Sequence, residues 1–315
     1  MTEIFGYKLL GELSPQNAGF CKWGFCEKKG RVFFIKEFLS PVYPADTKEL
    51  SERVIERKKK ICTEFFAAKA QYYEILNTCR TGNNVLILQF FRSGTKFYII
   101  TDKVESDGTD PRIIAALSND KKEAVIRSLL YSISKIHNAG LVHADLKPDN
   151  ILLKKTHDGF YAAKIIDFDS GFIVGHVPAN LQGDFVYLAP ETYLKINEED
   201  VNVTEKIDIF ALGILIHQYW TGELPSTDSK YNYLFEAAID GGNIYLSDQI
   251  PQGLKKVISR MLSADPSKRP PAETILKAYQ IRDDRRAEHY SRPVKDNQKD
   301  LIRSDGFHQL DDSEL

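Results

Sequence analysis

Short apolar runs separated by turn residues dominate the first hundred positions, a pattern typical of antiparallel β-strands. Five runs stand out, at residues 7–13, 20–27, 32–38, 85–91 and 96–101. Pro41 and Pro44 stop the third run, because proline has no backbone N–H to donate to a sheet. Ser93-Gly94 separates the last two runs and predicts a hairpin. The pattern therefore predicts a β-rich first part that ends near Lys103.

Residues 49–76 differ from the runs around them, because they are rich in helix-forming residues. Apolar residues recur there at three- and four-residue steps, which predicts one buried face made of Ile61, Phe65, Ala68, Tyr72 and Ile75. The same stretch holds a basic run, residues 57–60, with acidic residues on both sides. We interpret this run as a solvated helix face rather than as a binding patch.

The pattern becomes helical beyond residue 108. One helix is expected to begin at a cap formed by Asp120 and to end near Gly140. Its apolar stripe consists of Ile126, Leu129, Leu130 and Ile133. Three more helices are expected at residues 207–221, 254–262 and 272–280. From Ile281 onward charged residues dominate, which favours a mobile tail over a docking segment.

The longest apolar stretch, residues 207–220, contains Asp208, His217 and Gln218. It is too short to cross a bilayer, so we expect a buried core helix and no membrane span. The composition is that of an ordinary globular protein, with 43% hydrophobic and 27% charged residues among 315. A net charge of −2 gives no global field that would recruit nucleic acid or an anionic membrane.

The four cysteines have spacings that match no zinc or redox motif. The first residues show no basic stretch followed by an apolar one, as a signal peptide would require. Together these features favour a reducing, cytoplasmic location.

Two segments carry the candidate chemistry: HADLKPDN at residues 143–150 and IIDFDSGF at residues 165–172. Asp145 is placed to orient a hydroxyl and accept its proton, and Lys147 to neutralise charge on a transferring phosphoryl group. Asn150 and Asp167 offer oxygen ligands of the kind that Mg²⁺ prefers. We interpret His143 as a residue that shapes the loop by packing and hydrogen bonding.

These two segments, followed by Ala-Pro-Glu at residues 189–191, resemble the core of eukaryotic-like serine/threonine protein kinases, over about residues 5–280. The HAD and DFD forms of the motifs are similar to those of bacterial members. The resemblance implies an α+β, bilobal protein kinase-like fold. Residues 1–103 would form a small lobe, an antiparallel β-sheet with one main helix. Residues 104–280 would form a large, mostly helical lobe, and residues 281–315 a charged tail.

The resemblance also implies ATP as cofactor beside Mg²⁺, bound between the lobes. Lys36, in VFFIKEF, would bind its phosphates, with Glu64 or Glu74 as the lysine's partner and Glu64 favoured. The glycine-rich loop would be a degenerate one, with Gly11 and Gly19 on either side of ELSPQNA. The base would meet the hinge at residues 102–105. The further nucleotide contacts implied are Phe34, Asp102, Val104 and Leu152, with Thr101 behind them.

Two further matches imply structural roles. Glu191 and Arg269 would form the buried ion pair that anchors the segment after Asp167. Asp208 would begin the central helix and hold the backbone of the HADLKPDN loop.

The chain departs from the family pattern at four positions. Ala144 replaces an arginine that usually binds a phosphorylated segment, which favours activity without such phosphorylation. Asp169 replaces a glycine, and its charge either adds to the metal site or faces solvent. Asp184 replaces a threonine and either pairs with Lys147 or repels Asp145. Phe34 replaces a small residue and either stacks on the adenine or narrows its pocket.

The resemblance therefore implies an ATP- and Mg²⁺-dependent kinase that phosphorylates serine or threonine of a protein substrate and leaves room for a regulatory protein partner. Two alternatives remain. One is a pseudokinase-like nucleotide-binding or scaffold module with little phosphotransfer. The other is a kinase for a small metabolite, against which the Ala-Pro-Glu segment weighs.

Overall fold

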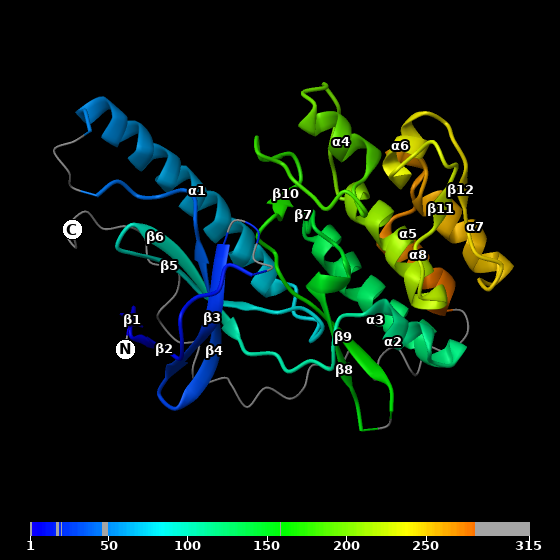
Figure 1. The fold of residues 1–315 in the computed structure, drawn as a ribbon, viewed down its shortest axis with the longest axis horizontal. Coiled ribbons are helices and arrows are strands. Elements are labelled where there is room, and N and C mark those ends of the chain that lie inside the picture. The colour runs from blue at the N-terminus through cyan, green and yellow to red at the C-terminus, as the bar shows by residue number, and fades with distance from the viewer. Residues whose placement is uncertain (1, 17–18, 20, 46–49, 158, 281–315) are drawn as a thin grey trace. The chain divides into compact units, whose positions relative to one another are not determined.

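A computed structural model describes all of the chain except residues 1, 17–18, 20, 46–49, 158 and 281–315. The expected tail, and part of the loop between Gly11 and Gly19, lie outside the described residues. The described chain forms two compact units. Unit 1 contains residues up to Thr78 and residues 85–104, and unit 2 contains residues 79–84 and those from Glu105 onward. The α+β architecture expected from the sequence is confirmed (Figure 1).

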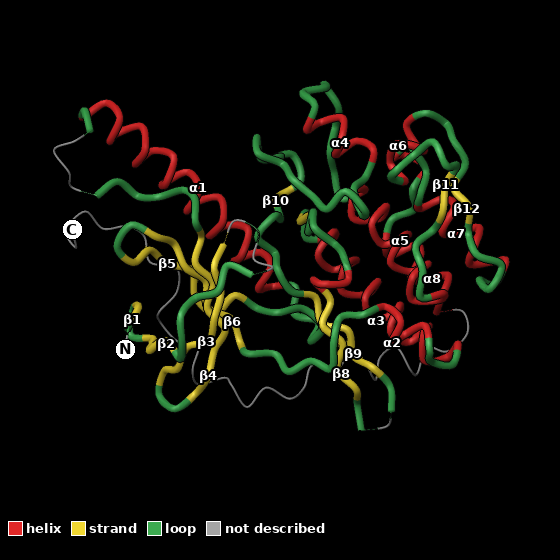
Figure 2. The backbone as a smooth tube through the Cα atoms, in the orientation of Figure 1, coloured by secondary structure: helices red, strands yellow, loops and turns green. Residues whose placement is uncertain are grey.

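Unit 1 is built on a six-stranded sheet in the order β1-β2-β3-β4-β6-β5, with every neighbouring pair antiparallel (Figure 2). Its strands are β1 (Glu3–Ile4), β2 (Tyr7–Leu9), β3 (Cys21–Lys28), β4 (Arg31–Phe38), β5 (Ile87–Ser93) and β6 (Lys96–Asp102). The expected hairpin is confirmed, because Ser93 pairs with Lys96. The first expected strand is shorter than predicted and ends at Leu9.

Alternation along β4 separates two faces of this sheet. Ile35 is fully buried in a core cluster with Cys26, Ile100 and Tyr98. Phe34 and Lys36 therefore lie on the opposite face.

The helix of unit 1, α1 (Glu52–Thr78), has a buried face that agrees with the prediction at Tyr72 and otherwise lies mostly one position further along. The buried residues are Cys62, Phe66, Tyr72, Tyr73 and Leu76. The rings of Phe65 and Phe66 both pack on Phe90 of β5, with centroids 6.1 and 4.7 Å away, and Phe66 is the more buried of the two. Ile61, predicted to be buried, is 47% exposed.

Unit 2 is mostly helical, with α2 (Pro111–Ala115), α3 (Asn119–Asn138), α4 (Pro190–Ile196), α5 (Lys206–Thr221), α6 (Leu234–Ile239), α7 (Gln252–Met261) and α8 (Ala272–Gln280). Its short strands are β7 (Leu141–Val142), β8 (Ile151–Lys155), β9 (Tyr161–Ile165), β10 (Phe172–Ile173), β11 (Ser226–Thr227) and β12 (Ile244–Tyr245), with 3₁₀ turns η1 (Pro148–Asn150) and η2 (Pro266–Lys268).

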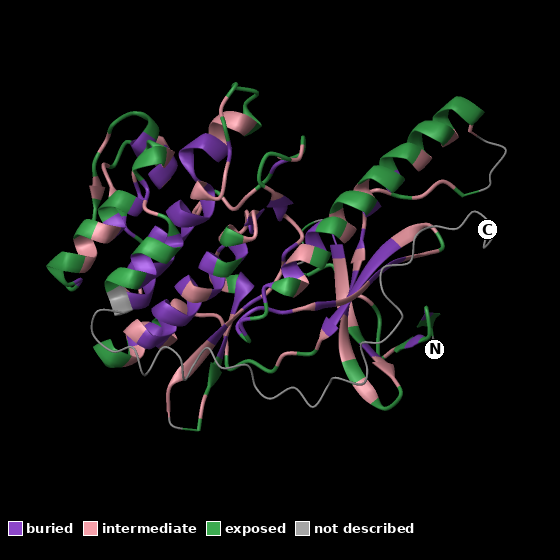
Figure 3. Ribbon diagram, turned by 180° about the vertical axis from the view of Figure 1, so that it is seen from behind, coloured by how far each residue is buried: buried purple, intermediate pink, exposed green. Residues whose placement is uncertain are grey.

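Helix α5 is the core of unit 2, because every residue from Ile207 to Trp220 is buried (Figure 3). Gly222, in the left-handed conformation with φ of 83°, ends it. Among the described helices, none is long and apolar enough to cross a membrane.

Two details of unit 2 differ from the sequence-based expectation. Helix α3 has Ser118 at its N-cap, and Asp120 lies inside the first turn, where a carboxylate is favourable to the helix dipole. The hairpin of β8 and β9 was not predicted, although Ile151 and Leu153 alternate with less buried residues there.

Buried His217 of α5 makes the stability of unit 2 depend on pH. Its Nδ1 lies 2.9 Å from the carbonyl oxygen of Glu223, and its Nε2 accepts from the Ser247 N–H at 3.1 Å. The ring must therefore be neutral, with its proton on Nδ1. Burial lowers the pKa of His217 below its usual 6.5.

We expect the free energy of unfolding to fall as the pH drops below about 6.5, because the unfolded chain binds a proton there that the folded chain refuses. Above that pH the residue is neutral in both states and contributes no pH dependence. This one group gives at most about 1.4 kcal/mol per pH unit. Urea unfolding at pH 7.5, 6.5 and 5.5 measures it, and His217→Gln should show a shallower slope. Equal slopes in the two proteins would contradict this assignment.

Candidate active site

Asp145 lies in the HAD loop, which we define as residues 143–150 between β7 and β8. The amide nitrogen of Asn150 donates to the Asp145 carbonyl oxygen at 2.7 Å and to its Oδ2 at 2.8 Å. Lys147 Nζ lies 3.1 Å from the same Oδ2. The carboxylate of Asp145 is therefore held by an amide on one side and an ammonium on the other.

Strand register brings Asn150 beside Asp167. Ile151 pairs with Ile165 across the β8–β9 hairpin, and the Ile166 N–H donates to the Asn150 carbonyl oxygen at 3.0 Å. Because the Asn150 amide group donates to Asp145, its Oδ1 is the end available to a cation. A neutral oxygen and a carboxylate are donors that suit Mg²⁺, so the residues present fit that ion.

Asp208, at the start of α5, holds the backbone of the HAD loop. Its Oδ2 accepts from the His143 N–H at 2.8 Å, and its Oδ1 from the Ala144 N–H at 2.9 Å. His137 Nε2 lies 3.0 Å from Oδ2. Burial raises the pKa of Asp208, but the hydrogen bonds and charges of His137 and His143 together outweigh burial, so the net pKa is lowered.

His143 is buried and joins the two chemical segments. Its Nδ1 accepts from the Asp145 N–H at 3.3 Å, and its Nε2 lies 3.0 Å from the Ile166 carbonyl oxygen. Its ring packs on Phe168 with centroids 4.8 Å apart. These contacts agree with the packing role expected from the sequence.

Asp184 pairs with Lys147 in the structure, at 3.9 Å between Oδ2 and Nζ. Its Oδ1 also accepts from the Val186 N–H at 3.0 Å, closing a turn. Nearby, the Tyr187 hydroxyl donates to Gln218 Oε1 at 2.8 Å, and burial raises the pKa of this phenol above its usual range. The first alternative for Asp184, pairing with Lys147, is the one that the structure shows.

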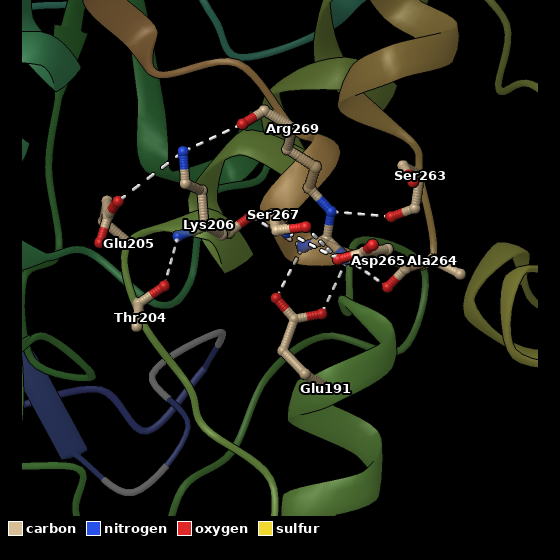
Figure 4. Close-up of polar contacts among 9 residues, drawn as sticks. All are labelled: Glu191, Thr204, Glu205, Lys206, Ser263, Ala264, Asp265, Ser267 and Arg269. Atoms are coloured by element: carbon tan, nitrogen blue, oxygen red, sulfur yellow. Dashed lines mark hydrogen bonds and ion pairs between the residues drawn. The ribbon is translucent and has the colours of Figure 1, made fainter.

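The chain after Asp184 is anchored by a buried ion pair (Figure 4). Arg269 is bidentate to Glu191, with nitrogen–oxygen distances of 2.6 and 2.8 Å. Its Nε donates to the Ser263 carbonyl oxygen at 2.8 Å, and Nη1 also donates to the Lys206 carbonyl oxygen at 2.9 Å. Lys206 closes the group by donating to the Arg269 carbonyl oxygen at 3.0 Å. The buried guanidinium charge is therefore paired with a carboxylate and hydrogen-bonded to backbone carbonyls. A buried charge without such partners would destabilise the fold.

In unit 1, Lys36 is buried in the middle of β4, opposite Trp23 of β3 and Ile99 of β6. Phe34 lies two residues before it on the same face and stacks on Trp23 with centroids 5.8 Å apart. Lys36, predicted to bind phosphates, thus lies beside the Trp23–Phe34 pair. The sequence analysis identified Phe34 but not Trp23.

The partner of Lys36 stays a prediction. The favoured residue, Glu64, has a side chain that is 65% exposed and forms an ion pair with Lys60, at 3.9 Å. The alternative partner, Glu74, is also exposed. Both lie off the buried face of α1.

The remaining residues expected to contact the nucleotide lie on different elements of the two units. Gly11 and Gly19 are exposed, and the loop between them is tied to β3, because Trp23 Nε1 donates to the Gln16 carbonyl oxygen at 2.8 Å. The Asp102 side chain, at the end of β6, accepts from Arg31 at 2.5 Å. Val104 ends the second stretch of unit 1, and Leu152 lies on β8 of unit 2; both are half-buried.

Comparison with known proteins decides the family. The profile of the protein kinase domain matches residues 45–279. The chain belongs to the protein kinase family. It is 28% identical to sperm motility kinase Z of Mus musculus over 212 residues, which are 66% of this chain and 41% of the mouse protein. It is 26% identical to the ovarian-specific serine/threonine-protein kinase Lok of Drosophila melanogaster over 289 residues, 90% of this chain and 55% of the fly protein.

A further serine/threonine-protein kinase of Drosophila melanogaster is 31% identical over 209 residues, 64% of this chain and 26% of that protein. This protein kinase chain thus spans about a quarter to a half of the length of these curated relatives. Their names agree with a eukaryotic-like serine/threonine member of the family.

An aromatic surface next to the kinase motifs was missed by the sequence analysis. Phe185 directly follows Asp184 and is 50% exposed. Its ring contacts Tyr233 and Phe235, with centroids 5.5 and 6.1 Å away, and Tyr193 stacks on Phe235 at 4.6 Å. The aromatic residues come from three separate stretches of sequence, so no local pattern could have joined them.

Replacing Asp208 by asparagine should loosen the HAD loop. The asparagine side chain carries no charge to face His137. Its NH₂ group would also point at a backbone N–H of His143 or Ala144, which is itself a donor. We expect the free energy of unfolding to drop by about 3 kcal/mol, as when one partner of a buried pair is removed. Urea unfolding measures it, with exposed Asp240→Asn as a control expected to stay within about 0.5 kcal/mol. Equal stability of both variants would contradict the role of Asp208.

Proposed function

We propose that this chain is an ATP- and Mg²⁺-dependent protein kinase that transfers the γ-phosphate to serine or threonine hydroxyls in the cytoplasm. The observation that carries the proposal is the joint placement of Asp145, Lys147, Asn150 and Asp167 by the β8–β9 register and the Asp208 hydrogen bonds. The four cysteines are free, which suits the proposed compartment.

Each residue has a separate task in this proposal. Asp145 orients the acceptor hydroxyl and accepts its proton as the bond to phosphorus forms. Lys147, 3.1 Å from that carboxylate, neutralises charge on the transferred group. Asn150 and Asp167 hold Mg²⁺, which when bound supplies charge neutralisation on the phosphates. Lys36 of β4 binds the nucleotide phosphates.

The aromatic surface beside Asp184 favours a protein as substrate over a small metabolite. Phe185 exposes half of its surface one residue after Asp184, which pairs with Lys147. Exposed aromatic residues on a rigid support are typical of protein contact sites. A small alcohol would leave this surface unused.

Activity without phosphorylation of the chain's own segment is the second element of the proposal. Ala144 provides no arginine to bind a phosphate there. The residues between Asp167 and Ala189 are instead held by the Asp184 turn, the Tyr187–Gln218 hydrogen bond and the pairing of β10 with β7. These contacts are made without any added charge.

A pseudokinase-like nucleotide-binding or scaffold module is the second candidate. Phe34, an aromatic residue at a position where the family has a small one, stacks on Trp23 on the sheet face that carries Lys36, which favours weak turnover. Nucleotide binding and turnover therefore have to be measured separately.

Asp145→Asn and Asp167→Asn should each lower phosphate incorporation from γ-labelled ATP by about 100-fold or more, since each removes a group proposed to act in the transfer. Wild type and variants are compared on a generic basic protein with Mg²⁺, and intact mass locates the phosphate on Ser or Thr. Asp149→Asn is the matched control, because Asp149 lies in the same loop and is exposed.

Three outcomes separate the candidates. Incorporation in the wild type and Asp149→Asn alone supports the kinase. No incorporation anywhere, together with a rise in the unfolding midpoint on adding Mg²⁺ and ATP, supports the binding module. No incorporation and no rise would support a scaffold role that needs no nucleotide.

Ser170→Ala should retain wild-type activity within about twofold, because the segment is held by bonds that need no phosphate. The test uses protein first treated with phosphatase and checked by mass spectrometry. Loss of activity in Ser170→Ala, with recovery in Ser170→Glu, would show that the segment does need phosphorylation.

A further inference from the structure

The first ten residues of α1 extend beyond the core of unit 1. From Glu52 to Ile61, eight residues are exposed, and only Ile55 and Lys59 are partly buried (Figure 3). The buried residues of the helix begin at Cys62. These ten residues continue a longer helix but have no core packed against them. A surface that covers them would therefore stabilise this end of the helix.

One side of this segment combines apolar and basic residues, and we name it the outer face of α1. Val54, Arg57, Lys58 and Ile61 follow one another at i, i+3, i+4 and i+7, so they share one side of the helix. Val54 is 41% exposed and Ile61 47%. The carboxylates of the same turns, Glu52 and Glu56, lie on a different side.

The end of the sequence carries a pattern of opposite charge. Residues 304–315, SDGFHQLDDSEL, contain four acidic residues and neither lysine nor arginine. Phe307, Leu310, Asp311 and Glu314 repeat the same i, i+3, i+4 and i+7 spacing. The order of the residue types differs: it is apolar, apolar, acidic, acidic in this segment and apolar, basic, basic, apolar on the helix. One apolar end and the central charges can therefore match in an antiparallel arrangement.

We propose that residues 305–315 dock on the outer face of α1 in the same chain. Phe307 and Leu310 cover Ile61, while Asp311 and Glu314 pair with Lys58 and Arg57. The basic run that the sequence analysis interpreted as solvated is then a binding surface. The 24 residues 281–304 form a tether that spans about 80 Å when extended.

A tethered segment needs little intrinsic affinity. Its effective concentration is on the order of millimolar, so weak charge pairs and two apolar contacts suffice to keep it bound part of the time. The contact should weaken at high salt, because exposed charges are screened over about 4 Å at 0.5 M salt. The contact is independent of phosphotransfer, so its test has no activity readout.

The test is zero-length carbodiimide cross-linking of the full chain, followed by peptide mapping. We expect Lys58 to link to Asp311, Asp312 or Glu314 within one chain, with a yield independent of protein concentration and reduced at 0.5 M salt. Links of these carboxylates spread evenly over other lysines, or links found only in a species of twice the mass, would overturn the proposal. The second result would assign the face to a partner copy.

Charge reversal tests the ion pairs between α1 and the terminal segment without any cross-link. In Arg57→Glu/Lys58→Glu, amide hydrogen exchange of residues 52–61 should speed up roughly fivefold, while residues 62–78 stay unchanged. Adding Asp311→Lys and Glu314→Lys should restore the slower exchange. Lys60→Glu is the matched control, since Lys60 is exposed but points off the outer face and pairs with Glu64. Failure of the second reversal to restore protection would overturn the proposal.

The apolar half of the contact has its own variant. Phe307→Ser/Leu310→Ser changes two residues beyond the part of the chain that the structure describes, and we expect it to leave the unfolding midpoint of the protein unchanged. It should speed exchange in residues 52–61 to the same extent as the charge reversal. Unchanged exchange in this variant would show that the segment does not cover the helix.

Discussion

One buried carboxylate, that of Asp208, governs the geometry of the candidate site. It accepts hydrogen bonds from two consecutive backbone N–H groups, of His143 and Ala144, and faces the ring of His137. Ala144 adopts a φ of 65°, a left-handed conformation that costs a residue with a side chain about 1–2 kcal/mol. The two charge-assisted bonds offset that cost, and Asp145 follows directly after the strained residue.

The same constraint passes from one chemical segment to the other. His143, whose backbone is fixed by Asp208, hydrogen-bonds with its ring to the carbonyl of Ile166, directly before Asp167. The backbone of Ile166 bonds in turn to Asn150. The proposed proton acceptor and metal ligands thus depend on the buried helix α5 and on one regular hairpin, whose residues nearest the site are buried. Loops that carry chemistry need such a support, because their own backbone has few partners.

Much of this was visible in the sequence, and the parts that were not have a common cause. Residues such as Asp145, Asn150, Asp208 and Arg269 stand in fixed spacings whose chemistry can be read locally, and the main helices follow from apolar periodicity. The rotation of α1 could not be read, because Phe65 and Phe66 are adjacent and either could lead the buried face. Both rings contact Phe90, and the structure places Phe66 nearer, at 4.7 Å against 6.1 Å for Phe65. The Phe185 cluster was missed because its members are distant in sequence.

The β8–β9 hairpin divides its own sequence into positions that can change and positions that cannot. Its paired residues, from Ile151 opposite Ile165 to Lys155 opposite Tyr161, fix the register that brings Asn150 beside Asp167. A single residue gained or lost inside either strand would turn every side chain beyond it to the other face. The connection after Lys155 contributes no pair to this register. Within the hairpin, it is therefore the place where the chain can change in length during evolution or accept an inserted peptide tag.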